Sequence, residues 1–510
     1  MKPTYYVTTP IYYVNGAPHI GHAYTSIAAD VMARFKRLDG FDVFFLTGTD
    51  EHGQKVEKAA AEAGLDPQSF SDRVSADFRD MTEKMGISND DFIRTTEARH
   101  KVSCTALWRR LEAAGDIYLG HYEGWYAVRD EAFYDEDELI IRDGAKLAPT
   151  GAPVEWVREP SYFFRLSAWQ DRLLQFFEDH PDFIAPSSSR NEVLSFVRGG
   201  LRDLSISRTT FAWGIPVPDA PGHVMYVWLD ALTNYITAAG FPNKDADRWR
   251  FWPADAHVVG KDIIRFHAVY WPAFLLSAGI TPPLRITSHG WWVVEGEKMS
   301  KSLGNVVEAR QLAATYGLDQ IRYFLLREKP FGNDGSMSHA AIVSRINVEL
   351  ANDLGNLAQR SLSLIAKNCD GVLPERGEAT VADATLLAAA AALPAALRER
   401  IDRQVFHEAL EEVWKVIRAA NAYIDHQAPW ALRRTDLPRM AVVLRVLIDV
   451  QRSIATVLQP FMPASMANLL NQLGVPADTR NLIDLDTPLP SGIALPPPIG
   501  VFPRYIEEAP

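Results

Sequence analysis

The segment that decides the fold is "TYYVTTPIYYVNGAPHIGHAYTSIAADVMARFKRLDGFDVFFLTGTD", residues 4–50. Its beginning, "TYYVTTP", is rich in β-forming residues, and Ile20–Leu38 has the apolar spacing of an amphipathic helix. Asp42–Asp50, "DVFFLTGTD", is an apolar run that ends in polar residues, as a buried parallel strand does. The order strand, helix, strand predicts a βαβ unit and therefore a parallel sheet.

The same order returns in "HVVGKD", "IIRFHAVYWPAFLLSAG" and "LRITSHG", which together span residues 257–290. We therefore predict an α/β fold, a doubly wound, Rossmann-like parallel sheet that an inserted module splits in two. Beyond residue 341 the chain turns to amphipathic, Ala-rich helices such as "HEALEEVWKVIRAANAYI", which predict an α-helical bundle ending near Leu473 and a Pro-rich extended tail. The predicted domains are residues 1–113 and 223–290 for the split sheet, 114–222 for the insert, 291–340 for a connecting region, and 341–510 for the bundle and tail.

Composition limits the class of protein. The chain has 510 residues, 47% of them hydrophobic and 23% charged, which is typical of a multidomain globular protein. Its formal net charge of −12 repels nucleic acid on average, so any RNA contact must come from local basic patches. Two cysteines, Cys104 and Cys369, cannot build a disulfide framework or a cysteine zinc site, which fits a reducing cytoplasm. We expect no signal peptide and no membrane helix.

Two histidines lie at the expected start of the first helix, His19 and His22, on either side of an Ile-Gly pair. A helix N-terminus favours phosphate through its exposed N–H groups and its dipole, and imidazoles can donate hydrogen bonds to phosphate oxygens. Gly21 leaves room for a flat base to approach the backbone. A zinc site is less favoured because no third ligand is evident nearby. Taken alone, however, the pair is equally typical of an ordinary helix start.

A second short motif, "EGEKMSKSLGN" at residues 295–305, carries Lys298 and Lys301 between two glycines. Alone, such a loop is typical of a solvated surface turn. Together with "PHIGH" in a split doubly wound fold, it resembles the HIGH and KMSKS signatures of the class I aminoacyl-tRNA synthetases, and both signatures match fully and in the expected order. The resemblance implies that ATP is bound by His19, Gly21, His22, Lys298 and Lys301, and that the two histidines and two lysines are catalytic.

The chemistry of such enzymes suits this arrangement. A carboxylate attacks the α-phosphate of ATP and pyrophosphate leaves, so positioning and charge stabilisation dominate catalysis. Two histidines and two mobile lysines can clamp the triphosphate, with Mg²⁺ neutralising the leaving group. The resemblance implies an aminoacyl-adenylate, then transfer to the 3′-terminal adenosine of tRNA, with Asp262 as the partner of the ATP ribose hydroxyls.

Within class I, the chain resembles the methionyl-tRNA synthetases over essentially its full length. "YVWLDALTNYI" places four residues on one helix face, and "GKDIIRFHAVYW" places two more on another. Such an aromatic stripe alone is typical of an ordinary core, but the resemblance implies that it forms the methionine pocket, in which Tyr235 and His267 touch the sulfur and Asp50 pairs with the ammonium. The full expected set is Ile11, Tyr13, Asp50, Trp228, Ala231, Leu232, Tyr235, His267 and Trp271.

The insert departs from the pattern of many methionyl-tRNA synthetases, which carry Cys-x-x-Cys pairs that hold zinc. Here the corresponding stretches are "WYAVRDEA" and "LAPTGAP", so the ligand positions hold Ala127, Asp130, Ala148 and Gly151. We therefore predict no structural zinc and a module held by packing, involving Trp125, Tyr126 and Trp156. An insert of roughly a hundred residues is also too small for the editing domain of the Ile, Val and Leu enzymes.

The helical region carries two further motifs. "GNLAQRS" places Asn356 and Arg360 four residues apart on one helix face, and "HQAPWAL" contains Pro429 and Trp430. Unpaired RNA bases are read by aromatic stacking and by hydrogen bonds to base edges. The alternatives are a buried bundle tryptophan and a solvated arginine. The resemblance implies that these residues read a CAU anticodon of tRNA(Met).

Two other functions compete with this interpretation. A nucleotidyltransferase could share the HIGH-type site, and a non-catalytic RNA-binding paralogue could share the whole architecture. The complete KMSKS loop and the anticodon-type bundle argue against the first, and the intact signatures argue against the second. Because no oligonucleotide-binding domain follows the bundle, we expect a monomer.

Overall fold

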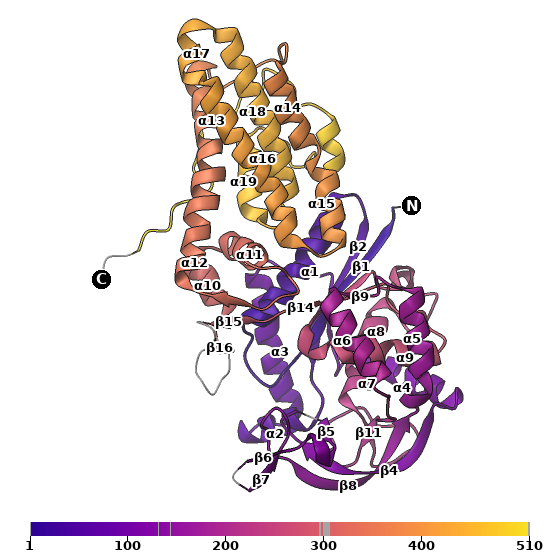
Figure 1. Cartoon of the computed structure of the whole chain (residues 1–510). Helices are drawn as coiled ribbons and strands as arrows, with labels where there is room; N and C mark the ends of the chain where they lie inside the picture. Colours follow the sequence, from indigo (N-terminus) through magenta and orange to yellow (C-terminus); the bar gives the residue numbers. More distant parts are fainter. Residues whose placement is uncertain (1, 131, 143, 295–296, 299–306, 508–510) are drawn as a thin grey trace. The chain divides into compact units, whose positions relative to one another are not determined.

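The computed structural model describes residues 2–130, 132–142, 144–294, 297–298 and 307–507 (Figure 1). The chain divides into two compact units. We call the first, Thr4–Pro18 with Phe44–His289, the sheet unit. The second, the helical unit, combines Met1–Pro3, His19–Val43 and Gly290–Pro510.

The core of the sheet unit is a six-stranded sheet with the strand order β3-β2-β1-β13-β14-β9. The pairs β1–β13, β13–β14, β14–β9 and β2–β3 are parallel, so the predicted doubly wound sheet is confirmed. Nearly all residues of β1 and β2 are buried, so both faces of these strands are covered, as is typical of parallel sheets. The strands are β1 (Thr4–Tyr13), β2 (Asp42–Asp50), β3 (Asp91–Arg94), β9 (Ile184–Ala185), β13 (Ala256–Gly260) and β14 (Ile286–His289).

The segment predicted as the insert, residues 114–222, contributes strands to four sheets. Four of its strands form an antiparallel sheet of order β10-β8-β4-β5, in which Ile117 pairs with Phe164 and Tyr126 with Glu155. Two small antiparallel sheets pair β6 with β7, and β11 with β12 (Val224–Met225). However, β9 lies in the same segment and forms the edge of the parallel sheet. A strand of two residues has no periodicity that sequence analysis could detect. Besides β9, the insert strands are β4 (Ile117–Ala127), β5 (Ala132–Tyr134), β6 (Ile140–Arg142), β7 (Ala145–Leu147), β8 (Glu155–Phe164), β10 (Leu204–Ser205) and β11 (Ser207–Arg208).

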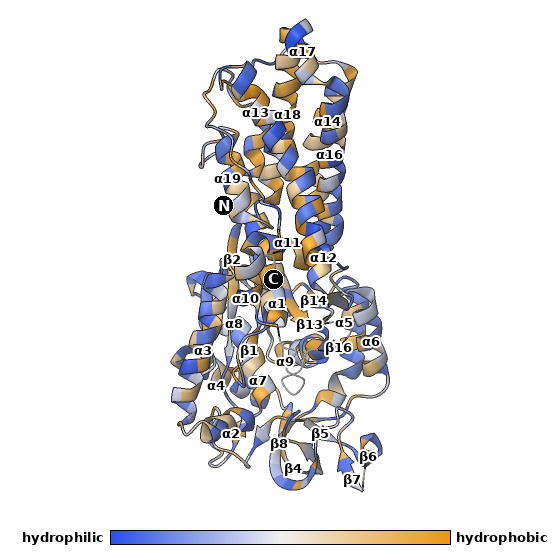
Figure 2. Cartoon of the chain, turned by 90° about the vertical axis from the view of Figure 1, so that its left-hand side faces the viewer, coloured by the Kyte–Doolittle hydropathy of each residue, from blue (hydrophilic) through white to orange (hydrophobic). Residues whose placement is uncertain are grey.

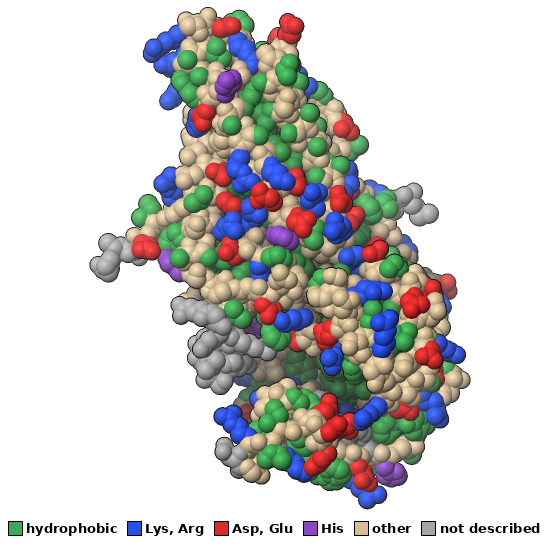
Figure 3. Space-filling view, in the orientation of Figure 1, with side chains coloured by type: hydrophobic (Ala, Val, Ile, Leu, Met, Phe, Trp, Pro, Cys, Tyr) green, Lys and Arg blue, Asp and Glu red, His purple; other side chains and the backbone are tan. Residues whose placement is uncertain are grey.

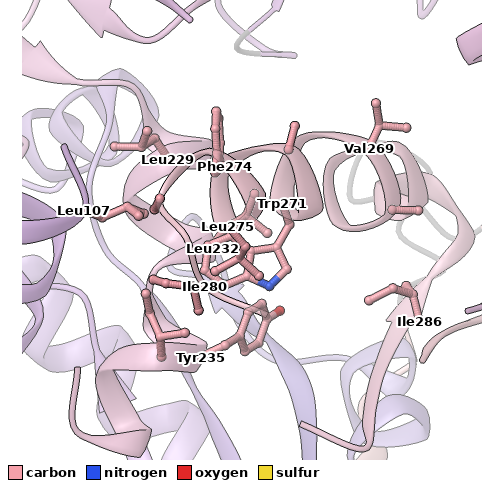
Figure 4. Packing of buried hydrophobic residues seen from close by; sticks show 14 of the residues in the cluster. Leu107, Leu229, Leu232, Tyr235, Val269, Trp271, Phe274, Leu275, Ile280 and Ile286 are labelled. Atoms are coloured by element: carbon pink, nitrogen blue, oxygen red, sulfur yellow. The ribbon is translucent and has the colours of Figure 1, made fainter. Parts of the chain in front are cut away.

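The helices of the sheet unit pack a large apolar core, part of which is shown in Figure 4. The side chains of Leu232, Tyr235, Trp271 and Phe274 meet there, all of them buried. The helices are α2 (Gln54–Glu62), α3 (Pro67–Lys84), α4 (Ala98–Ala113), α5 (Gln170–Asp179), α6 (Ser187–Arg198), α7 (Val227–Leu232), α8 (Asn234–Ala239) and α9 (Trp271–Ser277), and a π-helical turn, η5 (Phe266–Tyr270), precedes α9.

The helical unit consists of α1 and a bundle whose long helices run alongside one another (Figure 1). In Figure 2, apolar residues concentrate on the inner sides of these helices. The unit contains α1 (Ile20–Leu38), α10 (Ala309–Tyr316), α11 (Leu318–Arg327), α12 (His339–Ser344), the π-helix η7 (Arg345–Gly355), α13 (Asn356–Asn368), α14 (Val381–Ala391), α15 (Leu393–Asp402), α16 (Phe406–Gln427), α17 (Pro429–Thr435), α18 (Leu437–Leu458) and α19 (Pro463–Gln472). It also contains β15 (Trp292–Val294), β16 (Glu297–Lys298) and β17 (Gly335–Met337).

Backbone conformation and side-chain capping set the boundaries of α16, α17 and α18. Ala428 adopts a left-handed conformation, with φ of 43°, and separates α16 from α17, which begins at Pro429. The Asp436 side chain accepts a hydrogen bond from the Arg439 N–H at 3.0 Å and caps α18. The Pro-rich tail packs along the bundle. The carbonyl of Ile493, in the tail, accepts a hydrogen bond from the Leu373 N–H at 2.9 Å.

One helical stretch among the described residues, Val381–Asp402, has the length and the mean hydropathy, 1.4, of a membrane-crossing helix. It consists of two helices, because α14 ends at Ala391 and α15 begins at Leu393. Its Asp383 is buried and accepts hydrogen bonds from Arg439 and Tyr423, each at 2.6 Å. These contacts assign the stretch to the bundle.

A buried ion pair fixes α1 within the helical unit. Arg322 of α11 donates to the Asp30 carboxylate at 2.6 Å, and both side chains are almost fully buried. The same guanidinium also donates to the carbonyls of Pro460 and Phe461, at 2.9 and 3.1 Å, in the turn between α18 and α19. Arg322 therefore joins three parts of the unit at one point.

We predict that Arg322→Leu lowers the free energy of unfolding by up to about 3–5 kcal/mol, because it removes a buried counter-ion of Asp30 and leaves the partly exposed Arg34 guanidinium, at 2.7 Å, to balance the carboxylate. Urea unfolding followed by circular dichroism measures the change. Arg398→Leu is the matched control, since Arg398 pairs with Asp39 at 2.7 Å but is half-exposed, and it should cost less than about 1 kcal/mol. Equal losses in the two variants would contradict the prediction.

Candidate functional site

His19 and His22 form the first turn of α1. His19 is the N-cap, and its Nδ1 accepts a hydrogen bond from the Gly21 N–H at 3.1 Å, while the His22 Nδ1 accepts from the His19 N–H at 3.1 Å. Both Nδ1 atoms act as acceptors, so in the neutral rings the proton sits on Nε2. The rings stack with centroids 3.8 Å apart. The pair therefore caps the helix and keeps two Nε2–H donors on its positive end.

Gly21 is required by its neighbour in this turn. A Cβ atom at position 21 would lie 2.9 Å from Cε1 of the His19 ring, too close for a side chain. The Ile20 N–H donates to the Val307 carbonyl at 3.0 Å, which anchors the start of α1 to the segment after the KMSKS motif. The sequence predicts that Gly21 leaves room for a base; this stays a prediction, and in the structure the missing side chain also makes room for the capping imidazole.

The KMSKS motif begins on a short β-hairpin of the helical unit. Lys298 is the last residue of β16 and pairs with Val293 of β15, which in turn runs parallel to β17. Lys301 lies outside the described residues.

Tyr235 and His267, the residues predicted to touch the sulfur, are joined by a hydrogen bond of 2.7 Å between the phenol oxygen and Nε2. The His267 Nδ1 lies 3.0 Å from the Ile263 carbonyl, which can only accept, so Nδ1 carries the proton and Nε2 accepts from Tyr235. Burial lowers the pKa of His267 to about 4, although the Ile263 carbonyl opposes the shift. The pair is therefore neutral at physiological pH.

Aromatic rings surround this pair. Figure 4 shows the Trp271 side chain pointing from α9 toward Tyr235, and the ring centroids lie 6.1 Å apart. Trp228 lies edge-on to His267 at 6.3 Å and stacks on Phe266 at 3.7 Å. Ala231 and Leu232 lie on α7 with Trp228, and all the residues of the two predicted helix faces lie in the sheet unit.

The regular helix spacing that the sequence suggested is interrupted twice. Tyr235 lies on α8, which a turn at Thr233 separates from α7. His267 lies in the π-helical turn η5, immediately before α9 begins at Trp271. π-Turns inside helices are frequent at functional sites.

Asp50 ends β2 and is buried, with an exposed fraction of 6%. Its carbonyl accepts from the Val14 N–H at 3.1 Å, next to Tyr13 at the end of β1. The Tyr13 hydroxyl donates to the His52 carbonyl at 3.0 Å, and Ile11 is half-buried on the same strand. Asp262 follows β13 in a 3-10 turn and is exposed.

The four positions where zinc ligands would lie form two tight turns around an apolar contact. Ala127 and Ala148 are fully buried together with Ala152. The Asp130 N–H donates to the Ala127 carbonyl at 3.1 Å, and the Gly151 N–H donates to the Ala148 carbonyl at 2.8 Å. The Tyr134 hydroxyl donates to the Asp130 carboxylate at 3.0 Å. Ala127, Ala148 and Gly151 offer no ligand atom, so Asp130 is the only one of the four positions with a side chain that could bind a metal, and one carboxylate cannot build a tetrahedral zinc site.

The predicted anticodon residues lie at one end of the bundle. Trp430 is 41% exposed on α17, and the Arg360 guanidinium lies 5.3 Å from its ring centroid while pairing with Asp425 at 2.5 Å. Pro429 is buried beneath, and Asn356 is exposed at the start of α13. Figure 3 shows Lys and Arg side chains gathered at the α17 end, where Arg433 and Arg434 are exposed.

The sequence interpretation missed a buried polar group in the sheet unit. Asp230 of α7 is bonded by two histidines, His52 and His100, and Cys104 lies 3.2 Å from the second. Asp230 stands between two predicted pocket residues and His52 stands two residues after Asp50. Only these short distances along the sequence from predicted site residues could have pointed to Asp230 and His52. The bonds themselves could not be predicted, because His100 and His52 lie 130 and 178 residues from Asp230 in the sequence.

The depressed pKa of His267 predicts a pH effect on stability. The unfolded chain binds a proton near pH 6.5 that the folded chain accepts only near pH 4, so stability is complete above pH 6.5 and falls as the pH drops toward 4. Between pH 7 and pH 5 the wild type should lose about 2 kcal/mol more than His267→Gln in urea unfolding. His121→Gln, at an exposed position, should behave as the wild type. Identical losses for all three proteins would refute the prediction.

Comparison with known proteins gives the same picture over nearly the whole chain. A family described as "tRNA synthetases class I (M)" matches residues 5–362, and one described as "Anticodon binding domain of methionyl tRNA ligase" matches residues 373–509. The chain is 59% identical to a methionine–tRNA ligase of Mesorhizobium japonicum over 510 residues, which cover 99% of each chain.

Solved structures agree. A methionyl-tRNA synthetase of Mycobacterium tuberculosis in complex with methionyl-adenylate superposes with a TM-score of 0.97 at 56% identity, covering 98% of this chain and 100% of that one. The free form of the same protein superposes with a TM-score of 0.91 at 52% identity, covering 100% of this chain and 99% of that one.

Proposed function

This chain belongs to the methionine-specific class I tRNA synthetases, and we propose how its residues divide the work of that reaction. It activates L-methionine with ATP to methionyl-adenylate and transfers the methionyl group to the 3′-terminal adenosine of tRNA(Met), releasing AMP and pyrophosphate. The observation that carries this function is the match of both the synthetase and the anticodon-binding families, which together span nearly the full chain.

In the activation step, a methionine carboxylate oxygen forms a bond to the α-phosphorus of ATP while the bond to pyrophosphate breaks. We propose that His19 and His22 donate their Nε2–H groups to phosphate oxygens, which the tautomers and the helix N-terminus support. Lys298 and Lys301 then stabilise the charge on the leaving pyrophosphate, and Asp262 binds the ribose hydroxyls. Mg²⁺ accompanies ATP and supplies further neutralisation of the triphosphate.

For methionine recognition, the proposed pocket supplies an apolar, polarizable wall with one neutral polar pair. Aromatic rings suit a thioether, and the Tyr235–His267 pair offers a polar contact that leucine or isoleucine does not use. Asp50 pairs with the methionine ammonium, and its buried position strengthens that attraction. The neutral state of His267 supports the proposed place of the Tyr235–His267 pair in the pocket, because a buried imidazolium would repel the methionine ammonium.

For tRNA recognition, we propose that Trp430 and Arg360 contact the anticodon, with Asn356 and Pro429 at the same place. A core tryptophan would be buried, as Trp414 of α16 is, whereas Trp430 offers an exposed ring with a guanidinium beside it. Arg433 and Arg434 add local positive charge to a chain that is acidic overall.

We predict that Trp430→Ala reduces tRNA charging efficiency by about 5- to 150-fold, because it removes a stacking platform. Methionine-dependent exchange between ATP and labelled pyrophosphate should stay within about twofold of wild type, since that half-reaction does not use the bundle. Steady-state charging and exchange assays on one preparation measure both values.

Two controls separate stacking from stability. Trp430→Phe keeps a ring and should retain most of the charging efficiency, whereas the buried Trp414→Ala should lower the melting temperature. The proposed anticodon role of Trp430 is wrong if Trp430→Ala lowers the melting temperature and reduces pyrophosphate exchange and tRNA charging by the same factor.

For the insert, we propose that apolar packing replaces zinc. Ala127, Ala148 and Ala152 hold the two turns together, and Trp125 lies edge-on to Trp156 at 5.3 Å on the paired strands β4 and β8.

Metal analysis of the purified protein should therefore find less than about 0.1 zinc per chain, since structural sites hold zinc tightly and stoichiometrically. Exchange activity should be complete after dialysis against a chelator once Mg²⁺ is restored. One zinc per chain that survives dialysis and disappears in Asp130→Ala would overturn this proposal.

We also propose that the chain acts as a monomer in the cytoplasm. The bundle contacts of Asp383 support a location in water for the apolar stretch Val381–Asp402. Sedimentation equilibrium measures the assembly state, and a concentration-independent mass of twice 57.0 kDa would exclude the monomer.

A further inference from the structure

The Asp230 carboxylate is fully buried between two imidazoles. Its Oδ2 lies 2.7 Å from Nδ1 of His52, and its Oδ1 lies 2.8 Å from Nε2 of His100. All three side chains are at most 3% exposed. A carboxylate without a proton only accepts, so each of these nitrogens carries a proton and donates it.

Asp230 remains charged in this position. Burial opposes its ionisation, but the hydrogen bonds and the charge of His52 and His100 outweigh burial and lower its pKa to about 2. Hydrogen bonds to a charged acceptor are stronger than neutral ones. The carboxylate is therefore a firm link between the elements that carry its two partners.

The linked elements are those that carry the two ends of the proposed methionine site. Asp230 belongs to α7, whose residues Trp228, Ala231 and Leu232 are proposed to contact the methionine side chain. His52 follows β2 two residues after Asp50, the proposed partner of the methionine ammonium.

The backbone around His52 is held by further bonds. The Glu51 N–H donates to the Thr95 hydroxyl at 2.9 Å, and the Glu51 carbonyl accepts from Nε1 of Trp213 at 2.5 Å. The Gly53 N–H donates to the Trp213 carbonyl at 3.0 Å, and the Trp213 ring lies edge-on to His52. These contacts hold the segment against Thr95 and Trp213, and the bond from His52 to Asp230 holds it against α7.

We propose that Asp230 is a positioning residue for amino-acid binding: through His52 it fixes the Asp50 carboxylate relative to the pocket wall on α7. It thereby sets the distance between the sites for the ammonium and the thioether. This role rests on the proposed function of Asp50 and of the α7 residues.

A metal site is the alternative use of this cluster. His100, Cys104 and Asp230 each offer a ligand atom, and these atoms lie within 4.8 Å of one another. However, Nε2 of His100 donates its proton to Asp230, which leaves no lone pair there for a metal. Burial also raises the pKa of the Cys104 thiol, which keeps the sulfur protonated. The geometry is that of a hydrogen-bonded core.

Asp230→Asn tests the role, because it keeps the shape of the side chain and removes the charge. We expect the KM for methionine in pyrophosphate exchange to rise about tenfold or more, while the KM for ATP stays within about twofold. A general loss of structure would instead reduce the active fraction and lower kcat, with both KM values unchanged.

Cys104→Ala is the matched control. Cys104 lies in the same buried cluster, against His100 and Asp230, but belongs to α4 and leaves the His52 bond intact. It should lower the melting temperature without changing the KM for methionine. An equal rise in that KM for Cys104→Ala and Asp230→Asn would overturn the proposal, as would a stoichiometric metal in the wild type that Cys104→Ala removes.

A second variant keeps the proposal testable if Asp230→Asn fails to fold. Trp213→Phe at a half-buried position removes the bond to the Glu51 carbonyl and keeps a ring beside His52. It should raise the KM for methionine by a smaller factor, about three- to fivefold, again without changing the KM for ATP. A wild type that exchanges pyrophosphate with methionine, together with an unchanged KM for methionine in Asp230→Asn or, where that variant does not fold, in Trp213→Phe, would overturn the positioning role alone. A wild type without such exchange would overturn the proposed function itself.

Discussion

The buried pair between Asp30 and Arg322 is the constraint on which the helical unit depends. Two charges removed from water are costly unless each is well paired, so this contact tolerates little displacement. Here it holds the middle of α1, the helix whose first turn carries the HIGH histidines, against α11 and the turn between α18 and α19. The helix that carries the proposed catalytic histidines and the anticodon-binding bundle thus share one framework within the unit.

The histidines of α1 serve structure and chemistry with different atoms. Each Nδ1 satisfies a backbone N–H at the helix start, which would otherwise lack an intrahelical partner, and each Nε2 of the neutral rings carries the proton that we propose it donates to phosphate. Capping therefore fixes the tautomer that phosphate binding needs. The sheet unit uses the same device at His267, where a backbone carbonyl selects the tautomer that accepts from Tyr235.

The insert and the pocket illustrate two ways to hold a loop in place. In the insert, two turns close over the buried side chains of Ala127, Ala148 and Ala152, of which the first two stand at predicted zinc-ligand positions. Around Asp50, a buried charge and several backbone hydrogen bonds hold the chain. Apolar contacts suffice where a module needs only stability, whereas a binding residue must also keep its distance from its neighbours.

The sequence by itself determined the class of fold, the family and the residues of the HIGH and KMSKS motifs, because these depend on local order along the chain: strand, helix, strand, and a few side chains at fixed spacing. It also predicted the aromatic residues of a methionine pocket and the absence of a zinc site in the insert. Only the tertiary structure decided that Trp430 is exposed, that β9 completes the parallel sheet, and that Asp230 joins His52 to His100. The physical reason is that burial and hydrogen bonding between segments more than a hundred residues apart depend on how the chain packs, and no local pattern records that packing.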